Sequence, residues 1–339
     1  MAGNKRALAL GIVALTVSAA VFADDDARAL LERMERSLTG RNYQGTFVHE
    51  HGGQTETLRI IHRAETNGFT ERVVSLDGSG REVIRRDGEV RAYFPDQRAV
   101  LVDSGQRGGL LFPGLAGLDS AAGQIYTVRE ESHERCSGRN AHVVVVEPRD
   151  EFRYGYRVWI DKSSDMPLKT QLRTSGGRVV EQLVFTELTL PVQIPDSALQ
   201  PAVVARDWRW LRRGAVNGDY AERPADATWD ASELPPGFRL ISNSTQFVGS
   251  SQKPATHLVF SDGVASVSVF VEAPTEPLRD REFSTTTVTS LGSSSALSTE
   301  VNGHKVTTIG EVPPDTVRAI TRSLRVGFAP GAAGGAPRH

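Results

Sequence analysis

The fold is decided by residues Tyr43–Asp103, which open with "YQGTFVHEH" (43–51) and continue through "LRIIH" (58–62), "FTERVVSL" (69–76), "EVIRR" (82–86), "VRAYF" (90–94) and "AVLVD" (99–103). In the first of these runs Tyr43, Phe47 and His49 point one way and the residues between them point the other, as in a β-strand. Asp77-Gly78 and Asp87-Gly88 supply the positive φ of tight hairpin turns. A long antiparallel meander must bury one face, so we expect it to curl into a barrel or to wrap around another element.

A helix precedes the meander. Ala27, Leu30, Leu31, Met34 and Leu38 recur at helical spacing, which predicts an amphipathic helix with an apolar face to bury. Asp24–Asp26 are expected at its N-terminus and Gly40 at its end. We predict that this helix packs on the meander.

The segment that follows the meander, 104–123, combines six glycines with large apolar residues. The glycines disfavour regular structure, and a loop this apolar is costly in water unless it packs on a core or on a ligand. Two interpretations stay open, a hydrophobic flap over a cavity and a buried structural loop. The apolar side chains concerned are Leu110, Leu111, Phe112, Leu115 and Leu118.

The rest of the chain predicts a second module. Alternating runs resume at 125–188, so the first domain should span 24–190 with about ten strands and one long helix. A proline-containing linker, 191–228, carries Trp208 and Trp210, which we expect to dock the linker on a domain or a domain on a partner. A smaller domain, 229–326, has a strong hairpin signal at Asn302-Gly303 and a closing helix after Pro313. The tail 327–339 should be disordered.

The N-terminus has the features of a secretory signal peptide, 1–23. Lys5 and Arg6 precede an uncharged run that ends in Val21-Phe22-Ala23, so cleavage is expected after about Ala23. The mature protein should be soluble outside the cytoplasm. A net charge of −2 without a basic stripe argues against nucleic-acid binding. Cys136 is the only cysteine, so the chain has no internal disulfide.

Catalytic motifs are missing from the sequence. It has no nucleophile elbow, no phosphate-binding glycine loop and no dinucleotide fingerprint, so we expect no enzyme and no cofactor. One pattern could bind a metal ion: His49 and His51 share a strand face, and His62 on a neighbouring strand could be a third ligand. Polar face residues explain the same pattern, and no metal is predicted.

Five segments together resemble the RseB/MucB family, which consists of periplasmic negative regulators of the envelope-stress sigma factor. They are "NYQGTFVHEHGGQTETLRIIHR" (42–63), "ERVVSLDGSGREVIRRDGEVRAYFPDQ" (71–97), "YGYRVWIDKSSDMPLKTQLRTSGGRVVEQLVFTEL" (154–188), "HLVFSDGVASVSVFVE" (257–272) and "VTTIGEVPPDTVRAITRSL" (306–324). The resemblance covers essentially the whole mature chain in the family's order. It implies an α+β fold, with a large N-terminal curved antiparallel half-barrel like LolA and LppX and a smaller C-terminal α/β domain.

The resemblance also implies a function. Family members bind the periplasmic segment of a single-pass anti-sigma factor of the RseA/MucA type and shield it from regulated proteolysis. Lipopolysaccharide or a related lipid releases them, and homodimers or larger oligomers are part of the family picture. The glycine-leucine loop and the concave face would then accept acyl chains. Rim arginines could bind lipid phosphates, or they could be ordinary solvated residues: Arg85, Arg86, Arg91 and Arg107.

For the anti-sigma factor we predict binding to the C-terminal domain, where an edge strand could pair with an extended peptide. The candidate residues lie in two strands: His257, Val259 and Phe260, and Val267, Val269 and Val271. Two rival functions remain open, a lipid or lipoprotein carrier of the LolA type and a metal-dependent enzyme that uses the histidines. A pure carrier would need no second domain.

Overall fold

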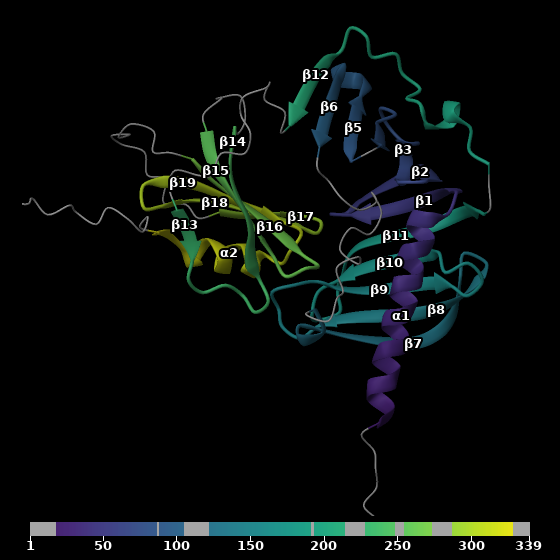
Figure 1. Cartoon of the computed structure of the whole chain (residues 1–339), viewed down its shortest axis with the longest axis horizontal. Coiled ribbons are helices and arrows are strands. Elements are labelled where there is room, and N and C mark those ends of the chain that lie inside the picture. Colours follow the sequence, from purple (N-terminus) through teal and green to yellow (C-terminus); the bar gives the residue numbers. More distant parts are fainter. Residues whose placement is uncertain are drawn as a thin grey trace, which may run out of the picture.

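The computed structural model describes residues 18–86, 88–104, 122–190, 193–213, 228–247, 254–272 and 287–327. They form a large curved sheet with a long helix across it and a smaller sheet domain beside it (Figure 1). This confirms the predicted α+β class. The large sheet has the order β12-β6-β5-β4-β3-β2-β1-β11-β10-β9-β8-β7. Its strands are β1 (Tyr43–His51), β2 (Gln54–Glu65), β3 (Gly68–Ser75), β4 (Glu82–Arg86), β5 (Glu89–Phe94), β6 (Ala99–Ser104), β7 (Tyr126–Cys136), β8 (Arg139–Pro148), β9 (Gly155–Asp161), β10 (Pro167–Arg173), β11 (Val179–Thr189) and β12 (Arg209–Arg213).

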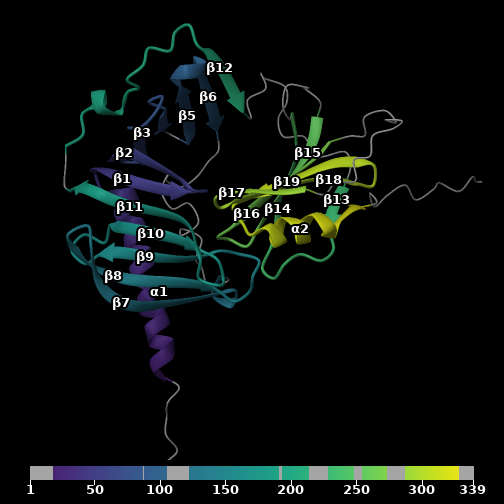
Figure 2. The same cartoon turned by 180° about the vertical axis from the view of Figure 1, so that it is seen from behind.

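The helix α1 (Ser18–Gly40) lies across one face of this sheet, as both views show (Figures 1 and 2). Its apolar stripe, Ala27, Leu30, Leu31 and Met34, is buried against Val128, Val144, Val146, Val158 and Ile160 of β7–β9. Leu38 continues the contact toward a second cluster around Phe47 and Phe185. The period-2 strands and the period-3.6 helix therefore bury their apolar faces against each other, as predicted. We call this side of the sheet the helix face.

The opposite face of β4–β6 is covered by the linker. Ile84, Tyr93, Val100 and Val102 are buried there against Val203, Ala205 and Trp208. The carboxylate of Glu82 accepts the N–H of Ala202, and Arg72 donates to the carbonyl of Ala198. The linker then adds β12 parallel to β6. The segment predicted as a loose connection is thus partly a strand of the first domain, although the tryptophan docking was predicted.

The second domain is a six-stranded antiparallel sheet in the order β14-β15-β16-β19-β18-β17, packed on α2 (Pro314–Ser323). A two-stranded β13-β20 pair flanks it. The remaining strands are β13 (Thr228–Ala231), β14 (Arg239–Phe247), β15 (Pro254–Ser261), β16 (Ser266–Glu272), β17 (Thr287–Leu291), β18 (Ser294–Val301), β19 (His304–Gly310) and β20 (Leu324–Gly327). At the β18–β19 turn Asn302 and Gly303 have φ values of 50° and 78°, the pair of positive values that a type I′ hairpin requires. This hairpin was predicted.

The N-terminal boundary differs from the prediction. In the part of the chain that the structure describes, α1 already includes Ser18 to Ala23, so Asp24–Asp26 lie within the helix instead of capping it. Its predicted end at Gly40 is confirmed. None of the helices described is both long enough and apolar enough to cross a membrane.

Candidate ligand cavity between the two domains

A cavity of about 360 Å³ lies on the helix face of the first domain, which is within the size range of small-ligand sites. It is formed where β1, β2, β3 and β4 meet β9, β10 and β11. The strand register brings Phe47 opposite Leu58, and Leu172 opposite Tyr156, so that residues distant in sequence share one face. The apolar lining consists of Phe47, Leu58, Val73, Val83, Tyr156, Leu172 and Leu183.

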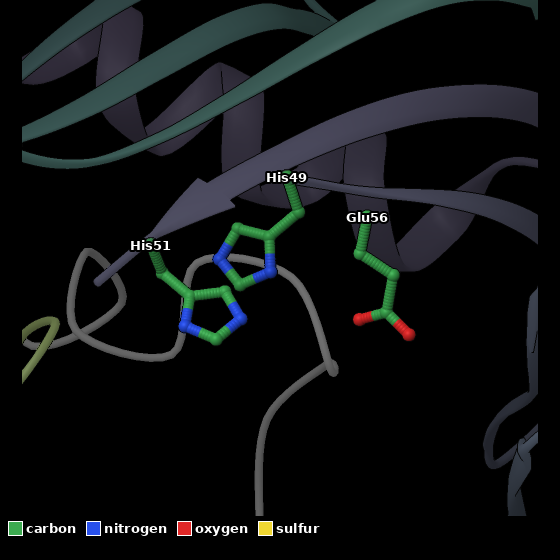
Figure 3. Close-up of side chains that lie close together, drawn as sticks. All are labelled: His49, His51 and Glu56. Carbon is green, nitrogen blue, oxygen red and sulfur yellow. The ribbon is translucent and has the colours of Figure 1, made fainter. Parts of the chain in front are cut away.

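Polar groups gather at one side of the cavity. His49, His51 and Glu56 come from the hairpin of β1 and β2 and lie close together (Figure 3). Glu56 accepts hydrogen bonds from Arg81 Nη2 at 2.9 and 3.0 Å and from Ser75 Oγ at 2.8 Å. His49 Nε2 lies 2.6 Å from Glu181 Oε1. The cavity is therefore amphipathic, with an apolar floor and a charged side.

The second domain contributes Glu311 to the wall of this cavity. Burial raises the pKa of Glu311, and the negative charge of Glu181 raises it further. Burial also pushes the pKa of Glu181 upward, but hydrogen bonds from His49 and Ser293 outweigh it, so that this pKa is lowered. Glu181 is accordingly the charged member of the pair, and Glu311 is the one that holds its proton more tightly.

The two domains touch at a second place beside the cavity. A Cβ built on Gly52 in the β1–β2 turn would lie 3.1 Å from the backbone nitrogen of Gly292 in the β17–β18 turn. A Cβ on Gly292 would lie 3.4 Å from Cβ of His51. The turn that carries His51 is thus packed directly against the second domain.

The predicted lipid-binding residues have separate outcomes. Leu110, Leu111, Phe112, Leu115, Leu118 and Arg107 lie outside the described residues. Arg85 is on the helix face but is buried, with its guanidinium 5.4 Å from the ring centre of Phe69.

Two of the predicted rim arginines lie on the wrong side of the sheet. Arg91 pairs in register with Ile84, whose side chain packs under the linker, and Arg86 has the same parity as Ile84. Arg86 and Arg91 therefore lie on the face opposite the cavity, and their assignment to its rim was wrong. The arginine that lines the cavity is Arg81.

The histidine pattern is also corrected. His62 pairs with Tyr43 at the far end of the hairpin, whereas His49 pairs with Glu56. His62 is buried between the rings of Tyr43 and Phe69, at 4.6 and 4.9 Å between ring centres. The third potential ligand beside His49 and His51 is therefore Glu56. Because Arg81 forms an ion pair with the carboxylate of Glu56, we describe His49, His51 and Glu56 as part of an ion-pair cluster and not as a metal site.

The strands predicted to bind the anti-sigma factor are interior strands. β15 pairs with β14 and β16, and β16 pairs with β15 and β19, so neither has a free edge. Four of the six candidate side chains form the core under α2, which corrects the expectation that they present a binding surface: Phe260, Val267, Val269 and Val271. His257 and Val259 point to the other face and are half-buried.

Sequence reasoning did not find several wall residues of the cavity. Arg81 sits in a turn between two strands, and Tyr156 and Leu172 were expected only as strand residues. Their alternation was a usable signal for a buried face. No sequence feature indicated that Glu311 lines the cavity, because it reaches the cavity only through the docking of the second domain.

Comparison with known proteins identifies the family. Residues 26–203 match the model of the MucB/RseB N-terminal domain, and residues 223–325 match the model of the MucB/RseB C-terminal domain. The chain belongs to the MucB/RseB family. It is 30% identical over 305 residues to the "Sigma factor AlgU regulatory protein MucB" of Pseudomonas aeruginosa, covering 88% of this chain and 91% of the relative. The "Sigma-E factor regulatory protein RseB" of Escherichia coli K12 is 26% identical over 332 residues, covering 95% and 98%.

A solved structure extends the MucB/RseB relationship to three dimensions. The MucA/MucB complex of Pseudomonas aeruginosa contains a chain that matches with a TM-score of 0.68 and 27% identity, covering 90% of this chain and all of that one. That MucB therefore shares both domains with the present chain. The two relatives are named as sigma factor regulatory proteins, and the solved structure shows that MucB in complex with MucA.

Proposed function

We propose that this chain is a periplasmic regulator that binds the periplasmic segment of a single-pass anti-sigma factor and shields it from regulated proteolysis. The complex with the anti-sigma factor would restrain the envelope-stress sigma factor. Lipopolysaccharide or a related lipid would bind the cavity, dissociate the complex and so free the sigma factor. Support comes from the family, from the regulatory names of the relatives and from the structure of a relative bound to MucA. The segment before Asp24 would direct export to the periplasm.

The observation that carries the lipid part is the composition of the cavity wall. Its apolar floor suits an acyl chain, and each buried methylene contributes about 0.8 kcal/mol, so roughly seven methylenes would contribute about 5–6 kcal/mol. Arg81, His49 and His51 at the charged side offer donors to a phosphorylated head group. Such a head group would have to displace Glu56 from Arg81.

Release follows if lipid and partner prefer different arrangements of the two domains. Glu311 of the second domain is part of the wall, so an acyl chain that fills the cavity acts on the contact between domains. Binding of one ligand then weakens binding of the other by the same factor, as thermodynamic linkage requires.

For the partner we propose the outer strand β14 in place of β15 and β16. In the part of the chain that the structure describes, β14 pairs only with β15, and it exposes Leu240 and Ile241 at 38% and 54%. His257 and Val259 lie on the neighbouring strand, opposite Ser244 and Ser242. An extended anti-sigma segment could add to this edge by backbone pairing, with the apolar side chains setting specificity.

The test is binding of the mature chain to a purified anti-sigma periplasmic domain, followed by titration with lipopolysaccharide. The proposal expects a complex that lipid dissociates and that protects the anti-sigma segment from the protease. Ile241→Asp should weaken the complex, whereas Ile309→Asp, an equally apolar exposed position at 42% on the interior strand β19, should not. Lipid binding without a complex would instead favour a carrier, and binding of neither would overturn the proposal.

A further inference from the structure

A β-bulge in β7 brings a carboxylate and two imidazoles to one place on the helix face. The register of β7 against β8 shifts between Glu130 and Ser132. On a regular strand residues three apart point to opposite faces, but the extra residue of a bulge reverses the alternation. Glu130 and His133 therefore emerge on the same face. His142 of β8 lies directly opposite His133 in the ladder.

The three side chains converge on one point. Glu130 Oε1 lies 2.6 Å from His142 Nδ1 and 3.2 Å from His133 Nδ1, and the two imidazole centres are 5.1 Å apart. One potential ligand atom from each residue lies within 4.8 Å of the other two. A tetrahedral ion with bonds of about 2.0–2.1 Å holds its ligands roughly 3.3 Å apart, so small side-chain rotations complete the geometry.

We propose that Glu130, His133 and His142 form a binding site for a divalent transition-metal ion, with zinc as the best match. Two imidazoles and one carboxylate are a ligand set that zinc accepts, with water as the fourth ligand. The side chains are partly exposed, at 30%, 58% and 26%, so an ion can enter from solvent. The bound ion takes the place of the imidazole N–H groups of His133 and His142, from which Glu130 otherwise accepts hydrogen bonds.

The surroundings distinguish this group from the cluster at the cavity. There, Glu56 is held by Arg81 and His49 by Glu181. Within the described part of the chain, Glu130 forms ion pairs only with His133 and His142. No arginine or lysine there forms an ion pair with Glu130 that a bound metal ion would have to displace. The neighbouring arginines Arg129 and Arg157 pair instead with Glu131, which the bulge sends to the other face.

The position of the site indicates what a bound ion does. β7 is the last strand of the twelve-stranded sheet, and its neighbour β8 supplies one of the ligands. An ion therefore links the edge strand to the sheet next to the residues that hold α1. Its water-occupied fourth position stays open to a side chain of a binding partner.

The experiment is isothermal titration of the metal-free mature chain with zinc chloride, alongside thermal unfolding. We expect one equivalent of zinc to bind, and a rise of about 5–10 °C in melting temperature when free zinc is 100 times Kd. Cobalt(II) bound in place of zinc should give the visible absorption of a four-coordinate site. The control His49→Ala/His51→Ala removes the other histidine pair and should keep both the stoichiometry and the shift.

Two variants decide the assignment. His133→Ala/His142→Ala should lose zinc binding, and Glu130→Gln, nearly identical in shape, should weaken it by at least ten-fold while its circular dichroism stays that of the wild type. Absence of zinc binding by the wild-type chain would overturn the proposal. The proposal would equally be overturned if both variants, Glu130→Gln and His133→Ala/His142→Ala, bound zinc as tightly as the wild type.

Discussion

Arg153 Nη1 of the first domain donates to Asp262 Oδ2 of the second at 2.6 Å, and both side chains are completely buried. The same guanidinium donates to Asp150 and to the carbonyl of Pro236. It also lies 5.7 and 5.3 Å from the ring centres of Tyr126 and Phe238, one from each domain. The contact between the domains is therefore organised around one buried charge whose donors are satisfied from both sides.

Replacing this arginine should separate the domains. Arg153→Ala leaves the carboxylate of Asp262 buried without its cation, and loss of one partner of a buried pair costs about 3–5 kcal/mol. We expect a lower melting temperature and faster tryptic cleavage between the domains. Arg36→Ala is the matched control, since its ion pair with Glu32 is about two-thirds exposed and should be worth under 1 kcal/mol. Equal effects of the two substitutions would contradict the role of Arg153.

The carboxyl of Glu311, in the wall of the cavity, should make the domain contact sensitive to pH. Its raised pKa means that the folded protein binds this proton more tightly than the unfolded chain does. Its contribution to stability is thus complete below the ordinary pKa of about 4.5 and is lost as pH rises through the raised value. Glu311→Gln should therefore melt at a higher temperature than wild type at pH 8 and at a similar temperature at pH 4. Glu300→Gln, in β18 and outside the cavity wall, should give no such trend.

A larger side chain in the cavity should block lipid but keep the partner. Leu172 lines the cavity without belonging to a core cluster, so Leu172→Trp fills the space where an acyl chain would lie. If the tryptophan excludes about three methylenes of the acyl chain from the cavity, the binding free energy falls by roughly 2.4 kcal/mol, a fifty-fold or larger loss of lipid affinity. Val179→Trp, at an exposed position of β11, is the control. Lipid titration by fluorescence, with a parallel anti-sigma binding assay, measures both effects.

The alternation of Tyr43–His51 and the hairpin signals were sufficient to predict the meander, because they depend on neighbours in sequence. The faces of the later strands were harder to predict. Whether Arg85 or Arg86 meets the cavity depends on which side the linker covers, and both sides of β4 carry apolar residues. Glu130 and His133 share a face only because of a bulge, which local alternation does not reveal.

Gly45 should be intolerant of any side chain. A Cβ at this position would lie 2.5 Å from the carbonyl oxygen of Glu187 and 2.9 Å from the ring of Phe185. The close approach occurs where the register of β1 against β11 shifts, so backbone would have to move. We expect Gly45→Ala to lower the free energy of unfolding by about 1–3 kcal/mol. Gly40→Ala, with nothing within 4 Å, should leave it unchanged or raise it slightly, and urea unfolding compares the two.

His62 should set part of the acid sensitivity of the first domain. Burial lowers its pKa from 6.5 to about 4, partly opposed by the hydrogen bond between Nδ1 and the carbonyl of Arg41. The unfolded chain therefore binds this proton at a higher pH than the folded one, and the folded state loses about 3 kcal/mol as pH falls from 6.5 to 4.

His62→Phe retains a ring between Tyr43 and Phe69 and removes the titrating group. Its unfolding free energy should be lower than that of wild type at pH 7, where the hydrogen bond is lost, but should fall less between pH 6.5 and 4. Urea unfolding at half-unit pH steps gives both slopes. His304→Gln, in the second domain, should retain the wild-type slope. A slope for His62→Phe as steep as that of wild type would show that other groups cause the acid sensitivity, because the loss assigned to His62 requires its imidazole.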